Sequence, residues 1–142
     1  SPMAENLLHF VSPEWVDLAR KVLEDLVSEH GETGVKYSIC EAFVGAPEEL
    51  ADENGELAWH FFVDGKEVEV ASGRADTDIS IQATYATSLP RARLVYTPEL
   101  TKEWEKNPPE PPDDPNLKVD GDTSTIPKYL SELHNRLAVA TL

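Results

Sequence analysis

The chain has 142 residues, of which 40% are hydrophobic and 27% are charged, and this composition is typical of one globular domain with a single core. Its formal net charge of −15 argues against a nucleic-acid partner and against adsorption to anionic lipid surfaces. No apolar run approaches the ~20 residues of a membrane helix and no basic segment leads into an apolar one, so we expect a cytoplasmic protein without stable membrane insertion.

The first strong structural signal is a helix start. Ser12 is a suitable N-cap, Pro13 suits the first helical position, and Glu14 lies beside the positive end of the helix dipole. Apolar residues then recur at spacings of three and four, which predicts an amphipathic helix of about 18 residues that Gly31 ends. Its predicted buried stripe is Trp15, Leu18, Ala19, Val22 and Leu26.

Alternating apolar residues after this helix predict β-strands. Asp64 and Gly65 predict a two-residue turn, and the alternation on both sides of it predicts a β-hairpin over residues 57–71. One face of the first hairpin strand is predicted to carry Leu57, Trp59, Phe61 and Val63.

Two further strands are expected around the hairpin. Residues 35–44 alternate with one interruption, at Glu41, and residues 79–84 alternate again. Cys40 lies in the first of these strands and is expected to be a core residue, because a lone cysteine can form neither an intrachain disulfide nor a thiolate metal site. Residues 45–55 and 72–78 carry glycine, proline and acidic residues and are predicted to be loops or turns.

The last third of the chain predicts short helices and one brief strand. Thr87 or Ser88 is expected to cap a helix with Pro90 in its first turn, and Thr97 is expected to cap a shorter one. Five prolines and three acids predict a stiff surface loop over residues 107–116. A strand over residues 117–119 then leads to a final helix, whose predicted buried stripe is Ile126, Leu130, Leu133 and Leu137.

This order of elements predicts an α+β fold. Antiparallel strands that follow one another and are covered by separate helices form such a domain, here a five-stranded, mainly antiparallel sheet. Residues 1–11 are expected to be an N-terminal tail, in which Ser1 and Pro2 are a tag remnant, and residues 12–142 are expected to form one domain.

Three segments, in order, resemble the sterol carrier protein 2 family of lipid-binding domains. They are the helix opening at residues 12–15, the hairpin at residues 61–68, and the strand and turn at residues 117–122 before an amphipathic helix. The resemblance covers about residues 10 to 140. It implies a five-stranded sheet with helices over one face and an apolar tunnel for acyl chains, sterols or similar lipophiles. It also implies structural, non-catalytic roles for four residues, Lys118, Val119, Gly121 and Asp122.

The sequence departs from the family pattern at one place. The connection before the last strand, short and apolar near the tunnel mouth in the family, is here the acidic, proline-rich segment 107–116. The middle and last helices border this loop and cover the sheet, so their apolar residues are the predicted ligand-lining set: Leu89, Leu94, Tyr96, Leu100, Trp104, Leu130, Leu133 and Leu137. The first functional hypothesis is therefore a non-enzymatic carrier of a lipophile.

Two other hypotheses remain open. The chain could be a cyclase, isomerase or hydrolase for a hydrophobic substrate, with His60, Asp76 or Asp78 as the base. It could also be an interaction module that forms a homodimer or docks on a partner enzyme.

Arg91 and Arg93 could meet a ligand carboxylate near the tunnel mouth. The scattered histidines and the single cysteine indicate neither a metal site nor a cofactor site.

Overall fold

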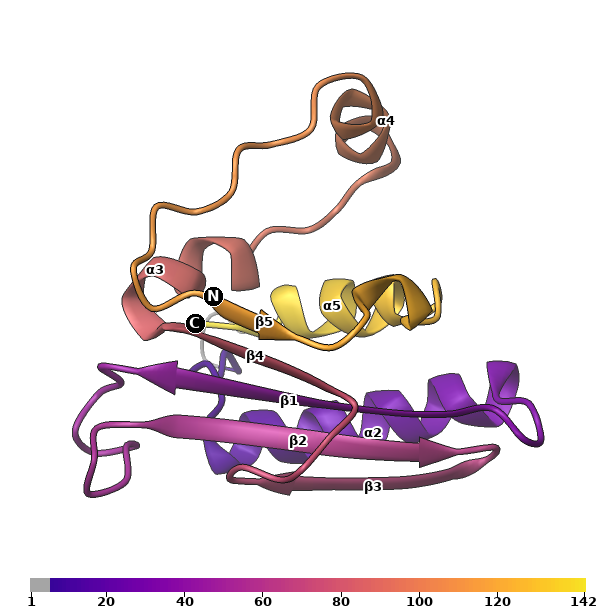
Figure 1. The fold of residues 1–142 in the computed structure, drawn as a ribbon, viewed down its shortest axis with the longest axis horizontal. Helices are drawn as coiled ribbons and strands as arrows, with labels where there is room; N and C mark the ends of the chain where they lie inside the picture. The colour runs from indigo at the N-terminus through magenta and orange to yellow at the C-terminus, as the bar shows by residue number, and fades with distance from the viewer. Residues whose placement is uncertain (1–5) are drawn as a thin grey trace.

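The computed structural model describes residues 6–142, and the expected tag remnant lies outside this part of the chain. Within it, the strands are β1 (Lys36–Val44), β2 (Leu57–Asp64), β3 (Glu67–Ser72), β4 (Ile79–Thr84) and β5 (Lys118–Asp120). The helices are α2 (Pro13–His30), α3 (Tyr85–Ala92), α4 (Pro98–Lys106), the 3-10 turn η1 (Thr123–Thr125) and α5 (Leu130–Ala138). The predicted α+β fold class is confirmed (Figure 1).

The five strands form one sheet in the order β3-β2-β1-β4-β5, and every neighbouring pair except β1 with β4 is antiparallel. The sheet is therefore mainly antiparallel, as predicted, although β1 and β4 are parallel. β4 follows β3 in the chain but lies beyond β2 and β1, so residues 73–78 must cross the sheet. This connection is fastened where Gly73 N donates to Ala58 O and Asp78 N donates to Ser38 Oγ.

The predicted hairpin is formed by β2 and β3, with its turn one residue later than expected. Asp64 pairs with Glu67, so the two turn residues are Gly65 and Lys66. Gly65 has a φ of 62°, and glycine at the first turn position is favoured in tight hairpin turns. Asp64 does not need a positive φ and extends the strand.

Helix α2 begins and ends at the predicted residues. The Ser12 side chain accepts a hydrogen bond from Trp15 N at 3.2 Å, and the helix has 18 residues. Gly31 ends it with a φ of −63°, so left-handed backbone is not the reason for glycine there. A Cβ at Gly31 would instead collide with the carbonyl oxygen of Gly65. The buried face of α2 packs on the sheet, where Trp15 meets Trp59 edge-on with ring centroids 5.1 Å apart.

Helix α3 begins earlier than predicted. It starts at Tyr85, directly after β4, so Thr87 and Ser88 lie inside it and neither caps it. The reason is a tertiary contact, because the buried Tyr85 donates its hydroxyl hydrogen to Phe10 O at 2.7 Å. Pro90 consequently lies inside the short helix, close to its end.

Helix α5 begins later than the predicted apolar stripe. The stripe starts at Ile126, whereas the helix starts at Leu130. Asp122 caps the separate 3-10 turn η1, and Pro127 disfavours helical backbone in the residue before it. The strand β5 before this region is shifted by one residue from the prediction.

Residues 93–117, called the arm below, leave the body of the domain and return to it. Helix α4 has no buried residue, and Figure 1 shows it apart from the sheet between two extended connections. The predicted stiff surface loop over residues 107–116 is the returning connection. Hydrogen bonds fasten both ends of the arm: Tyr96 N donates to Asn135 Oδ1 at 2.8 Å, and Thr84 N donates to Asp114 Oδ2 at 2.7 Å.

Candidate functional site

On the helix-covered face of the sheet, side chains are buried at one end and exposed at the other. Trp59, Glu41, Ile81 and Val119 lie opposite one another across β2, β1, β4 and β5, and we call these four residues the row. Trp59 is 3% exposed beneath α2, whereas Val119 is 49% exposed. Glu41 and Ile81 lie between these limits. The β4–β5 end of the row therefore presents apolar surface that the described chain covers only in part.

Glu41 places a carboxyl group in this otherwise apolar row. Its Oε1 accepts a hydrogen bond from Trp59 Nε1 at 2.9 Å. Within residues 6–142, no lysine, arginine or histidine forms an ion pair with it. Burial raises the pKa of Glu41 above its ordinary value, and the hydrogen bond from Trp59 opposes only part of this rise. The row thus combines apolar surface with one hydrogen-bonding group whose ionised form is disfavoured.

Half-buried apolar residues lie on the helical side of the domain. Figure 1 shows α3 and α5 towards the β4–β5 side of the sheet. Residues that lie against the core without being enclosed by it include Leu89 and Ala92 of α3, Ile126 and Tyr129 just before α5, and Leu130 at its start. These positions form part of the partly buried margin of the core.

Tyr96 fixes the start of the arm on α5. Its ring stacks on His134 with centroids 3.9 Å apart and an interplanar angle of 8°, and the centroid of the Trp104 ring lies 5.2 Å from that of Tyr96. His134 Nε2 lies 2.7 Å from Leu94 O. Burial lowers the pKa of His134, opposed by its hydrogen bond to the Leu94 backbone. The stack therefore pairs a tyrosine with a histidine whose protonated form is disfavoured.

The charges around Tyr96 connect the arm with the row. Burial raises the pKa of Tyr96, neighbouring Arg91 lowers it, and the negative charge of Glu41 adds to the rise. Arg91 also lies over the Trp104 ring at 4.9 Å from its centroid, whereas Arg93 donates to Leu142 O at 2.7 Å. We call Tyr96, Trp104 and His134 the Tyr96 cluster. Of the two arginines expected near the tunnel mouth, Arg91 is thus the one beside this cluster.

The structure brings the eight predicted ligand-lining residues together only in part. Leu133 and Leu137 are 6% and 5% exposed and belong to the core cluster. Leu89 and Leu130 are half-buried at its edge. The other four lie on the arm: Leu94, Tyr96, Leu100 and Trp104. Whether any of the eight contacts a ligand remains a prediction.

The three residues of the enzyme hypothesis lie elsewhere. His60 is on the opposite face of β2 from Trp59, and its Nδ1 lies 2.7 Å from Gly73 O. Asp76 and Asp78 are exposed on the connection that crosses the sheet. The fold therefore does not bring these side chains to the row.

The acidic and metal-ligating side chains of residues 6–142 are dispersed. No group of three or more histidine, cysteine, aspartate or glutamate side chains is arranged to hold a metal ion there. None of the helices in this part combines the length and apolar character that crossing a bilayer requires. Cys40 is buried in β1, as expected.

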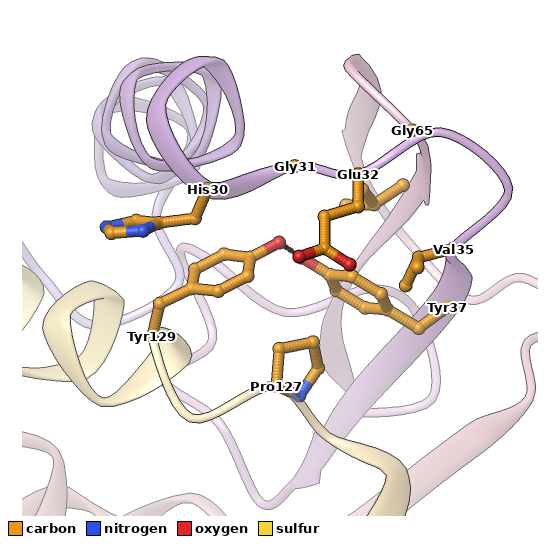
Figure 2. Close-up of a pocket in the computed structure, with 9 residues that line it drawn as sticks. His30, Gly31, Glu32, Val35, Tyr37, Gly65, Pro127 and Tyr129 are labelled. Atoms are coloured by element: carbon orange, nitrogen blue, oxygen red, sulfur yellow. Dashed lines mark hydrogen bonds between the residues drawn. The ribbon is translucent and has the colours of Figure 1, made fainter.

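Two of the hollows in the surface of residues 6–142 lie away from the row. The first, of about 200 Å³, is smaller than the range of about 300–1,000 Å³ common for small-molecule sites, and it is lined by His30, Gly31, Glu32, Val35, Tyr37, Val63, Gly65, Pro127 and Tyr129. Figure 2 shows the hydroxyl groups of Tyr37 and Tyr129 meeting there in a hydrogen bond. Burial, followed by this hydrogen bond, raises the pKa of Tyr37.

The second hollow, of about 540 Å³, lies beside the loop before β2 and is lined by Leu50, Ala51, Asp52, Asn54, Glu56, Leu57, Ala58, Ser72, Gly73 and Arg74. Its charged groups already have partners. Glu56 Oε1 accepts from Arg74 Nε at 2.5 Å, and Asp52 Oδ1 accepts from the backbone N–H groups of Asn54 and Glu56. None of the eight predicted ligand-lining residues lines either hollow.

In the sequence, Glu41 stands out only as an interruption of the apolar alternation, and no functional role was predicted for it. A single acid at an inward position of an otherwise apolar strand was the available signal, because an unpaired carboxylate is costly to bury. Ile81 and Val119 gave no such signal. Their place beside Glu41 depends on the parallel pairing of β1 with β4, which links segments far apart in the chain.

Comparison with known proteins supports the fold. No family model matches the sequence, and no curated protein matches it. The crystal structure of sterol carrier protein 2 matches with a TM-score of 0.52 at 16% sequence identity, over 94% of this chain and 100% of that chain. A conserved hypothetical protein from Thermus thermophilus, described as possibly a sterol carrier protein, matches with a TM-score of 0.49 at 16% identity, over 94% of this chain and 92% of that chain. The expected resemblance is thereby confirmed at the level of structure: this chain has the fold of sterol carrier protein 2.

Proposed function

We propose that the protein binds and carries a lipophilic small molecule of the fatty acyl or sterol type, in an apolar tunnel entered between α3 and α5. The observation that carries this proposal is the incomplete cover of the row, since Val119 is 49% exposed at its open end. The shared fold supports the proposal because the matched structure is that of a sterol carrier.

Burial of hydrocarbon is sufficient to drive such binding. Each methylene that leaves water stabilises the complex by about 0.8 kcal/mol, so a ten-carbon chain contributes about 8 kcal/mol before the cost of association is subtracted. The half-buried residues of α3 and α5 would supply the second wall, opposite the row. The net charge of −15 would keep the loaded protein soluble.

A fluorescence titration with Nile red, a neutral probe of apolar sites, tests the proposal. Three exposed valines allow the same substitution to be made at three places: Val119→Lys at the row, Val35→Lys at the first hollow, and Val139→Lys at neither. The three side chains are 49%, 43% and 57% exposed, so each lysine can reach solvent and the variants are expected to fold.

The expected result is that wild type binds Nile red and that Val119→Lys alone weakens the binding. Weakening by Val35→Lys in place of Val119→Lys would move the site to the first hollow and contradict the proposal. Equal binding by all three variants, or no binding by wild type, would also contradict it. Extraction of the purified protein with organic solvent, followed by mass spectrometry, would identify any lipophile that copurifies.

A further inference from the structure

Glu41 is an unusual residue for the position that it holds. It lies on β1, at the centre of the sheet, and faces the same side as Trp59 and Ile81. Placing a carboxyl group among apolar side chains without a cationic partner is costly, and an apolar residue of similar size would avoid that cost. Packing alone therefore does not account for an acid at this position.

The carboxyl group retains hydrogen-bonding capacity. A carboxyl has two oxygens that can accept hydrogen bonds, and within residues 6–142 only Oε1 of Glu41 is engaged, by Trp59 Nε1 at 2.9 Å. Among residues 6–142, no enclosed side-chain nitrogen or oxygen lacks a hydrogen-bond partner, and Glu41 is itself only half-buried. Its second oxygen is therefore accessible, on the face of the sheet that the proposed ligand would cover.

We propose that Glu41 is the polar anchor of the ligand site, and that the ligand is a lipophile whose head carries a hydrogen-bond donor, either a hydroxyl or an ammonium group. This inference rests on the proposed function. A hydroxyl head complements the second oxygen in both protonation states, because it can donate to the ionised oxygen or accept from a protonated one, whereas an ammonium head complements the ionised form. A ligand carboxylate would instead be repelled by ionised Glu41.

Arg91 is the rival anchor, since it is the arginine beside the Tyr96 cluster and could attract a carboxylate head. Its guanidinium already lies over the Trp104 ring at 4.9 Å and beside Tyr96. The charge of Glu41 reaches the same tyrosine. Glu41 would thus favour a hydroxyl or ammonium head and Arg91 a carboxylate head, and a comparison of ligands with these heads can separate the two.

The test is displacement of Nile red by three ten-carbon ligands that differ only in the head: decanol, decylamine and decanoate. Wild type is expected to bind decanol and decylamine more tightly than decanoate. In Glu41→Gln, which keeps an acceptor for Trp59 Nε1, decylamine should lose roughly tenfold in affinity and decanoate should gain roughly tenfold, with decanol little changed. Glu24→Gln on the exposed side of α2 is the control for the change in net charge and should match wild type.

Three outcomes would overturn the inference. One is a wild-type preference for decanoate that Arg91→Gln abolishes, and another is a Glu41→Gln profile identical to wild type for all three heads. Both leave the proposed function standing, because Nile red would still bind and Val119→Lys would still weaken it. Failure of wild type to bind Nile red would remove both proposals. If circular dichroism shows that Glu41→Gln folds poorly, Glu41→Met takes its place, because methionine keeps the side-chain length without the charge. This variant must show the same loss of affinity for decylamine.

Discussion

The substitution Glu41→Gln tests, without any ligand, how the charge of Glu41 affects the stability of the folded protein. In the unfolded chain this carboxyl titrates near its ordinary pKa of 4.5, and burial raises the pKa in the folded protein. Between these two values the folded state binds more protons than the unfolded state, so the group makes the protein less stable as the pH rises. Glutamine has no charge and removes this effect.

The magnitude follows from the same linkage. Across the interval from pH 4.5 up to the raised pKa, the free energy of unfolding should fall by up to about 1.4 kcal/mol per pH unit because of this one group. Water reaches one of its oxygens, so the observed slope should be smaller than that limit. Above the raised pKa, Glu41→Gln is expected to be more stable than wild type by the accumulated difference.

Urea denaturation of wild type, Glu41→Gln and Glu24→Gln from pH 4 to pH 8 measures this difference. The stability of wild type must be subtracted from that of Glu41→Gln at each pH. Hydrogen bonds lower the pKa of Asp114 and of Asp122, so these two groups make every variant more stable as the pH rises, which is opposite to the effect of Glu41. The stability advantage of Glu41→Gln should grow as the pH rises from 4 and then level off. A difference that stays flat with pH, or an advantage that shrinks as the pH rises, would refute the account of Glu41.

Three further substitutions test the packing of the fold by urea denaturation. Tyr129→Phe removes the hydrogen bond to Tyr37 and should lower the free energy of unfolding by about 1 kcal/mol; an unchanged value would mean that the bond is absent in solution. Gly121→Ala should destabilise by about 1–3 kcal/mol, because Gly121 has a φ of 96° and a Cβ would collide with Asp78 O, and a neutral effect would contradict this close approach. Leu133→Ala should cost about 2–5 kcal/mol as a core truncation, whereas a loss below about 1 kcal/mol would show that Leu133 lines open space.

The parts of the fold that depend on neighbouring residues could be predicted from the sequence. The start of α2 at Ser12 and the β2–β3 hairpin around Gly65 follow from capping and turn chemistry within a few residues. The start of α3 could not, because Tyr85 is drawn into the helix by a hydrogen bond to Phe10, 75 residues away in the chain. The parallel pairing of β1 with β4 likewise depends on a connection whose path no local pattern records.

The sequence predicted which helices border the candidate site, but not which of their residues are exposed to it. The sequence directed attention to the helices that cover the sheet, and Leu89, Leu130 and Tyr96 do lie at the edge of the core or on the arm beside it. Burial decided the rest: Leu133 is enclosed, although its helical spacing matches that of Leu130. Glu41 was visible as an interruption, but its relation to the open end of the row required the register across three strands.

Intermolecular nuclear Overhauser effects between decanol and the methyl groups of the labelled protein test the central claim most directly. We predict contacts from the decanol chain to the methyl groups of Ile81 and Val119, at the open end of the row, and of Leu130, on the proposed second wall. Contacts confined to Val35 or Leu50, which line the two separate hollows, would contradict this account. So would saturating decanol that gives no contact to any methyl group of the protein.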